Sequence, residues 1–143
     1  IDKFWNNIFA VQPKYIIIRD MIFDESIERE TPINFYSKLL IFCNKNGLSL
    51  KLQEFERNFG KITNYKNFIH FLLKYFYIDN WDREVRENYV PLSYQKFLLN
   101  LPSNYRIEYA EHYTLPFFKH KWEEEIGIFV DEKIHLKIIL KKI

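Results

Sequence analysis

The sequence predicts an α+β protein, with a helical cluster over about residues 1–101 packed against a small antiparallel β-meander at about 105–142. Three observations favour this class. Apolar residues recur at helical spacing between Thr31 and Phe76, polar and apolar residues alternate at strand spacing from Tyr105, and no Gly- or Ser-rich linker separates the two patterns. For a chain of 143 residues we expect a single compact domain spanning residues 1–143, helical over residues 1–101 and β-structured over residues 102–143.

The first 23 residues contain two predicted elements. A short amphipathic helix is expected over the first ten residues. The stretch from Tyr15 to Phe23 is apolar except for Arg19 and Asp20. It fits either a buried helix with Pro13 in its first turn or a strand through Tyr15–Ile18, and we favour the helix.

Three helices with very short turns are predicted next. In the first, Thr31 supplies an N-cap oxygen and Pro32 fits the first helical position, where its missing N–H is not needed. Each helix begins at a capping residue and the first two end at glycine, so that they cover 31–47, 49–60 and 63–76. Because the turns are so short, the three helices must pack as one unit. Two shorter helices are expected over 80–88 and 93–101.

The last third of the chain carries the predicted β-meander. Tyr105, Ile107 and Tyr109 alternate with charged residues, which is typical of a strand. A second strand is expected within Phe117–Val130 and a third over Ile134–Ile143, and the residues between them are few enough for a hairpin.

The composition limits what clusters of aromatic or basic residues can mean. Phe, Tyr, Ile, Lys and Asn make up 70 of 143 residues, as A/T-rich codons would specify, so such clusters are expected without any function. The net charge is only +2, which does not favour a strongly basic nucleic-acid or membrane binder. Cys43 stands alone in an apolar pattern, so we expect a buried side chain and no disulfide. We expect an intracellular, soluble protein, because no apolar run approaches the roughly 18 residues of a membrane span.

Signatures of catalysis and of metal or cofactor binding are weak. The three glycines stand at 47, 60 and 127 and form no phosphate-binding loop, and there is no paired-cysteine site. We therefore expect no cofactor and no bound metal. His112, His120 and His135 fall in the β region and would make a zinc set with Glu111 or Glu123 if they converged. Separate histidines at strand edges are the preferred interpretation.

One short motif points to RNA cleavage. Arg106 is followed after five residues by His112, and this spacing resembles the motif of HEPN ribonucleases. The resemblance implies a helix in which the Arg and His act together at the scissile phosphate of RNA. Tyr105, Ile107 and Tyr109 have strand spacing instead, so an RNA-cleaving enzyme using Arg106 and His112 is only a remote alternative.

Two features favour a nucleic-acid-binding domain as the main alternative. Residues 49–76 have the spacing of a helix-turn-helix, with Lys61 and Lys66 at the start of its second helix. Four lysines of the tail form either an electropositive stripe or a strand edge protected from aggregation, and the second interpretation is preferred: Lys133, Lys137, Lys141 and Lys142.

Our leading hypothesis is a non-catalytic protein-interaction or assembly module, such as one subunit or domain of a larger complex. The chain lacks a coherent catalytic set, yet it has more large aromatic side chains than a domain of this size is expected to bury. The candidate binding residues are Lys61, Lys66, Tyr75, Tyr77, Lys133, Lys137, Lys141 and Lys142. Further tyrosines expected at the working surface are Tyr89, Tyr94 and Tyr113.

Overall fold

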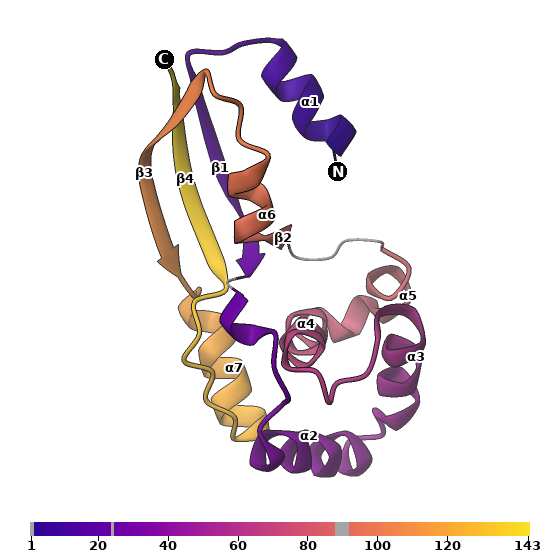
Figure 1. The fold of residues 1–143 in the computed structure, drawn as a ribbon. Helices are drawn as coiled ribbons and strands as arrows, with labels where there is room; N and C mark the ends of the chain where they lie inside the picture. Colours follow the sequence, from indigo (N-terminus) through magenta and orange to yellow (C-terminus); the bar gives the residue numbers. More distant parts are fainter. Residues whose placement is uncertain (1, 24, 88–91) are drawn as a thin grey trace. The chain divides into compact units, whose positions relative to one another are not determined.

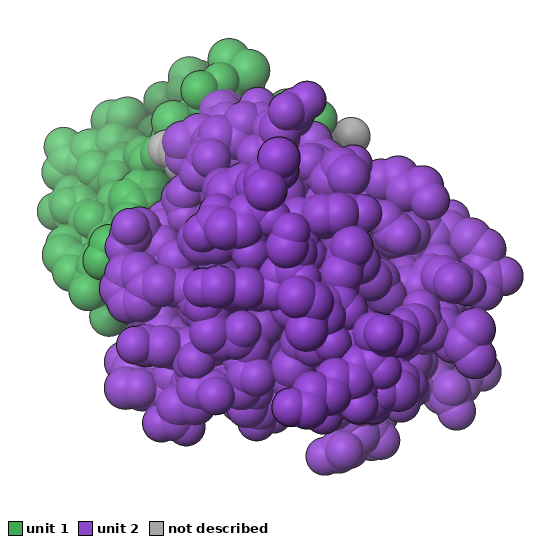
Figure 2. Space-filling view, turned by 90° about the horizontal axis from the view of Figure 1, so that it is seen from below, with its two compact units in different colours: residues 1–24, 92–113, 133–143 green, residues 25–91, 114–132 purple. Residues whose placement is uncertain are grey.

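The computed structural model describes residues 2–23, 25–87 and 92–143, and the chain is α+β as predicted. It divides into two compact units, which Figure 2 shows in different colours. Unit 1 consists of residues 1–24, 92–113 and 133–143, and unit 2 consists of residues 25–91 and 114–132. Within the described ranges, no helix has the length and apolar character needed to cross a bilayer.

Unit 1 is built on a sheet whose strands lie in the order β2-β1-β4-β3 (Figure 1). The strands are β1 (Tyr15–Phe23), β2 (Leu92–Ser93), β3 (Tyr105–Tyr113) and β4 (His135–Lys142). The last strand, β4, is antiparallel to both β1 and β3, and β2 pairs in parallel with the end of β1. Two helices, α1 (Asp2–Ala10) and α6 (Tyr94–Leu99), complete the unit.

The helix that we favoured for Tyr15–Phe23 is wrong, because this segment is strand β1. Ile16, Ile17 and Ile18 are β-branched and fit an extended backbone better than a helix. Ile16 and Ile18 are each 8% exposed while Ile17 is 65% exposed, which is the alternation of a half-buried strand. The sheet is therefore not the predicted meander of the last third of the chain, since β4 pairs with this early strand.

The strand predicted within Phe117–Val130 is also wrong. Helix α7 (Pro116–Ile126) lies there, in unit 2, with Pro116 in its first turn and Gly127 in the left-handed conformation at its end, at φ 75°. Its buried side chains are Phe118, Trp122 and Ile126, which recur every four residues. The predicted hairpin before β4 consequently does not exist.

The core of unit 1 lies between one face of the sheet and the two helices. Figure 1 shows α1 and α6 on the same side of the sheet. The strands contribute Ile16, Ile18, Leu136, Ile138 and Leu140, and Phe97 of α6 packs with them. Trp5 and Phe9 of α1 pack against the same cluster. No described helix of unit 1 lies over the opposite face.

Unit 2 is helical. Its elements are η1 (Glu25–Ile27), α2 (Ile33–Lys45), α3 (Ser49–Phe59), α4 (Tyr65–Tyr75), η2 (Ile78–Asn80), α5 (Trp81–Glu84) and α7. The three predicted helices are confirmed as α2, α3 and α4, but all three caps differ from prediction. Ser49 is the first residue of α3 and does not cap it, because the N-cap is Leu48. Thr31 does not cap α2, because its hydroxyl donates to the Ile62 carbonyl at 2.6 Å. Asn64 rather than Thr63 caps α4, by accepting a hydrogen bond from the backbone N–H of Asn67.

Large side chains fill the core of unit 2. The indole of Trp122 is fully buried and its Nε1 donates to the Leu72 carbonyl of α4 at 3.1 Å, so α7 and α4 are joined by packing and by a hydrogen bond. Cys43 is 1% exposed, and burial raises the pKa of its thiol to about 12. The prediction that Cys43 is a buried hydrophobic residue is confirmed.

Candidate functional site

The candidate site is the face of the unit 1 sheet that is turned away from α1 and α6. Residues that pair across neighbouring strands point to the same side of a sheet. Three rows of paired residues therefore share this side, each written in the order β1, β4, β3: Tyr15–Lys141–Arg106, Ile17–Ile139–Tyr109 and Arg19–Lys137–Glu111. We call these nine residues the open face.

The middle row of the open face is apolar and accessible. Ile17 is 65% exposed and Tyr109 is 46% exposed, and Ile139 lies between them on the central strand. Antiparallel sheets commonly leave one face in contact with water, and that face is usually polar. An exposed apolar row across three strands departs from this pattern, which makes it a candidate contact surface.

Positive charge is concentrated on both sides of this apolar row. Four cationic side chains and one carboxylate, that of Glu111, belong to the open face. Arg106 pairs with Glu108 at 3.2 Å, but within the described ranges no carboxylate forms an ion pair with Arg19, Lys137 or Lys141. Since the whole chain has a net charge of only +2, the open face is clearly more positive than the average surface.

The aromatic side chains of the open face lie close to these charges. Lys141 Nζ lies 5.8 Å from the ring centroid of Tyr15, and Lys14 Nζ lies 5.6 Å from the same ring. The Tyr109 hydroxyl donates to the carboxylate of Glu111 at 2.9 Å, and Glu111 sits opposite Lys137 in the register. Flat rings and positive charges thus lie side by side on this part of the sheet.

A β-bulge in β3 decides which side chains reach the open face. The register shifts between Ile107 and Tyr109, so Glu108 is an extra residue with no partner on β4. Arg106 and Tyr109 would otherwise lie on opposite faces, because they are three residues apart. The strand predicted around Tyr105, Ile107 and Tyr109 is confirmed, but the bulge sends only Tyr109 to the open face.

A stacked aromatic pair lies at one end of the open face. The rings of Tyr113 and His135 lie 5.5 Å apart with an interplanar angle of 22°. His135 is buried, and burial lowers the pKa of its imidazole below the ordinary value while the charge of Asp20 raises it. Burial therefore favours the neutral imidazole, and the positive charge of the open face comes from arginine and lysine.

Among the tail lysines proposed from the sequence, two belong to the open face. Lys137 and Lys141 point to it from β4. Lys142 lies opposite Tyr105 instead, and its Nζ donates to the side chain of Gln12 at 2.9 Å. Lys133 precedes β4 and is exposed. The β1 residues of the open face were missed, and the signal that could have revealed them was the alternation of Tyr15, Ile17 and Arg19 with two buried isoleucines.

The remaining candidate residues lie in unit 2, and α4 does not present an exposed recognition face. Most of α4 is buried, including every residue from Phe68 to Tyr75. Lys66 pairs with Glu28 at 3.1 Å, and Lys61 lies 4.0 Å from Glu56. A recognition helix needs an exposed face to enter a groove of DNA, so this arrangement does not favour the helix-turn-helix interpretation.

The tyrosines proposed for the working surface divide into buried and accessible ones. Tyr75 is only 5% exposed and its hydroxyl donates to Glu125, so its expected place at the surface is wrong. Tyr77 is 43% exposed. Tyr94 is half-buried, with its ring 4.9 Å from that of His112. Tyr89 lies outside the described residues.

Arg106 and His112 do not come together. Arg106 belongs to the open face, whereas His112 pairs with Leu136 on the core side of the sheet. They are also separated by about 17 Å along the sheet, because their partners Lys141 and Leu136 are five residues apart on β4 and each residue advances a strand by roughly 3.3 Å. This pair is not positioned to act on one phosphate, and we propose no ribonuclease activity from it.

The histidines considered as metal ligands are also separated. His112 and His135 point to opposite faces of the sheet, and His120 belongs to α7 in unit 2. Across the described portion of the chain, no group of three or more His, Cys, Asp or Glu side chains is placed to hold a metal ion.

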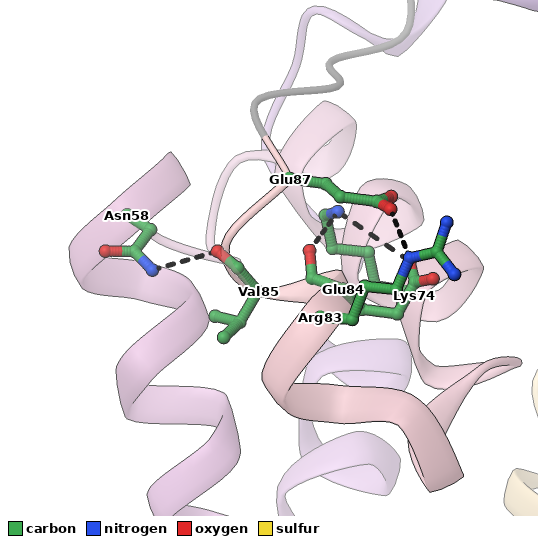
Figure 3. A network of polar contacts seen from close by, with 6 residues as sticks. All are labelled: Asn58, Lys74, Arg83, Glu84, Val85 and Glu87. Atoms are coloured by element: carbon green, nitrogen blue, oxygen red, sulfur yellow. Dashed lines mark hydrogen bonds and ion pairs between the residues drawn. The ribbon is translucent and has the colours of Figure 1, made fainter.

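Unit 2 contains a buried lysine that the sequence patterns did not reveal. Lys74 is 4% exposed, and its Nζ donates to the Glu84 carbonyl at 2.7 Å and lies 5.0 Å from the ring centroid of Phe59. Burial lowers the pKa of the Lys74 amine, and the charges of Glu84 and Glu87 raise it. Asn58 donates to the Val85 carbonyl in the same network (Figure 3). Because the amine holds the end of α5, we interpret Lys74 as structural.

Comparison with known proteins gives no relative: no protein-family model, curated protein or solved structure matches this chain. What the open face can bind follows from its own chemistry. Its rows are about 7 Å apart along each strand. An apolar, aromatic row between two cationic rows can hold a flat apolar group at its centre and anionic groups on both sides.

Proposed function

We propose that this protein is a non-catalytic interaction module, one component of a larger assembly, and that the open face of unit 1 is its contact surface. The observation that supports this function is the exposed row Ile17–Ile139–Tyr109 between two cationic rows. Accessible apolar and aromatic side chains together with arginine are typical of interaction surfaces. The intracellular, soluble location expected from the sequence belongs to this proposal.

The proposal is tested by site-specific photo-cross-linking in the cells from which the protein comes. A cross-linking amino acid at Ile17 is expected to capture a partner macromolecule, because this side chain is exposed and belongs to the middle row of the open face. Leu50 of α3 is a matched control, since it is 76% exposed and belongs to unit 2. Adducts at Leu50 but none at Ile17 or Tyr109 would contradict the proposed surface.

A second candidate surface, for a protein partner, is the outer side of α2 in unit 2. Ile33 is 83% exposed and Ile41 is 68% exposed, and their separation of eight residues places them near one face of the helix. Leu40 beside them is also exposed. Exposed isoleucines at helical spacing fit a hydrophobic groove of another protein.

The α2 surface is tested by replacing Ile41 with Asp and measuring which proteins co-purify with the chain. Loss of one specific companion protein would support α2 as a docking helix. Leu50→Asp is the control, because it introduces the same charge at another exposed helical position of unit 2. An unchanged set of companions in Ile41→Asp would reject this second surface.

A further inference from the structure

We infer that the ligand of the open face is a single-stranded nucleic acid. This inference rests on the proposed function, because it names the partner of the same surface. It starts from the cations. Arg19, Lys137 and Lys141 have no carboxylate within ion-pair distance in the described ranges, so their charges are available to phosphate groups. They stand in two rows on either side of the apolar row.

The aromatic and aliphatic side chains favour a nucleic acid over a simple polyanion. Tyr15 and Tyr109 are about half exposed, and Ile17 presents an apolar surface beside them. Unpaired bases are flat and can stack on accessible tyrosine rings, whereas phosphates alone gain nothing from such rings. In a duplex the faces of the bases are stacked within the helix, so the strand that fits must be single.

The size of the open face argues for an extended ligand rather than a folded protein. Three strands spaced about 4.8 Å apart and three rows spaced about 7 Å apart cover on the order of 300 Å². A stable interface with a folded protein needs roughly 800 Å² on each partner. A few nucleotides lying across the strands need much less, and single-strand binders work with sites of about 4–16 nucleotides.

The carboxylates of β3 suggest where the phosphates lie. Glu111 is bonded to the Tyr109 hydroxyl at 2.9 Å and repels phosphate at its end of the third row. Glu108 pairs with Arg106 at 3.2 Å and weakens the attraction of that guanidinium. The phosphate-binding side chains are therefore Lys141, Lys137 and Arg19, on the β1 and β4 side of the face.

The experiment is fluorescence anisotropy with the full chain and labelled oligo(dT) and oligo(U) of about 12 nucleotides, within the usual site sizes. Both strands are expected to bind, with a slope of log affinity against log salt of about −2, because each of three phosphate contacts contributes about −0.7. A duplex of the same length is expected to bind more weakly, and inorganic polyphosphate is expected to compete poorly because it has no bases.

Paired variants locate the site. Lys137→Gln and Lys141→Gln are each expected to reduce the size of the salt slope by about 0.7. Lys61→Gln and Lys66→Gln, in unit 2, are the controls and are expected to leave it unchanged. Tyr109→Ala is expected to weaken binding roughly 5- to 150-fold, as loss of one base stack would. Tyr77→Ala is the control at similar exposure and is expected to leave binding unchanged. Unfolding transitions are measured for all variants to check that each is folded.

Several results would overturn the inference. One is that neither single strand binds at low salt. Another is that the duplex or polyphosphate binds as tightly as the single strands. A third is that only the Lys61 and Lys66 variants lose binding. Binding to vesicles with anionic lipid but not to oligonucleotides would identify a membrane surface instead. The Ile17 cross-link tests the proposed function separately from this inference. If it captures a protein, the open face is still supported as a contact surface, but the inference that its ligand is a nucleic acid is contradicted.

Discussion

Tyr109 of β3 lies directly opposite Ile139 of β4, and the extra residue Glu108 makes this pairing possible. Without the bulge, Tyr109 could not share the open face with Arg106 while Ile107 faces the core. One residue that forms no cross-strand pair thus sets the composition of the candidate surface.

Deleting Glu108 is expected to destabilise unit 1. The segment before the bulge must then either flip Tyr105 and Ile107 out of the core or break its pairing with β4. Loss of these contacts is expected to cost about 2–5 kcal/mol in the free energy of unfolding, measured by chemical denaturation. Glu108→Ala keeps the backbone length and is expected to change stability by less than about 0.5 kcal/mol. Equal effects of the two changes would show that the bulge has no structural importance.

Ile17 and Ile18 are neighbours in β1 with opposite roles, and substitution should separate them. Ile18 is buried in the core, so Ile18→Ala is expected to lower the free energy of unfolding by about 2–4 kcal/mol. Ile17→Ser is expected to change it by less than about 1 kcal/mol, because this side chain is already largely exposed. The same denaturation curves measure both. If Ile17→Ser is the more damaging change, the open face is covered in solution.

Because of Lys74, the stability of unit 2 is expected to depend on pH in the alkaline range. Burial lowers the pKa of its amine below 10.5, so between the folded pKa and 10.5 the unfolded chain binds more protons than the folded chain. The contribution of Lys74 to stability therefore rises with pH across this window. Lys74→Met keeps most of the side-chain volume without the charge, and the stability difference between the native protein and this variant is expected to shift in favour of the native protein as pH rises. A difference independent of pH would mean that the folded pKa is not lowered.

Two buried tyrosines are expected to give the opposite effect, a loss of stability as pH rises. Burial and hydrogen bonds to Glu132 and Glu125 raise the pKa of Tyr65 and Tyr75 above 10.0, so their stabilisation is complete below pH 10.0 and is lost as pH rises above it. We expect the double variant Tyr65→Phe, Tyr75→Phe to be less stable at neutral pH by about 1–3 kcal/mol, from two lost hydrogen bonds. It should lose stability more slowly than the native protein in denaturation experiments between about pH 8 and pH 11. Parallel losses would contradict the assignment.

Local patterns predicted helices α2, α3 and α4 of unit 2 well. The apolar spacing and the terminal residues that define a helix are separated by only a few positions in the chain. Short-range sequence information was therefore sufficient to predict α2, α3 and α4. The strand β1 was only the less favoured alternative to a helix, because its partners Leu140 and Ile138 lie more than a hundred residues away and an isoleucine run alone fits a buried helix or a strand. Helix α7 was missed although Phe118, Trp122 and Ile126 have helical spacing.

The candidate surface was predicted only partly, for the same reason. Lys137 and Lys141 were identified because the alternation of β4 is local. Tyr15, Ile17 and Arg19 were not, because they join the open face only when β1 pairs with β4. Tyr109 reaches the open face only because of the bulge at Glu108, and this bulge can be recognised only from the pairing of β3 with β4.

The sequence by itself determined the α+β class, the helices α2, α3 and α4, the strands β3 and β4, and the burial of Cys43, because short-range periodicity and composition control these properties. Only the tertiary structure decided that β1 joins β4, that α7 is a helix, and that rings and cations from three separate segments share one face of a sheet. Strand pairing is a long-range interaction, and its hydrogen bonds and facing side chains come from residues that no local pattern identifies as partners.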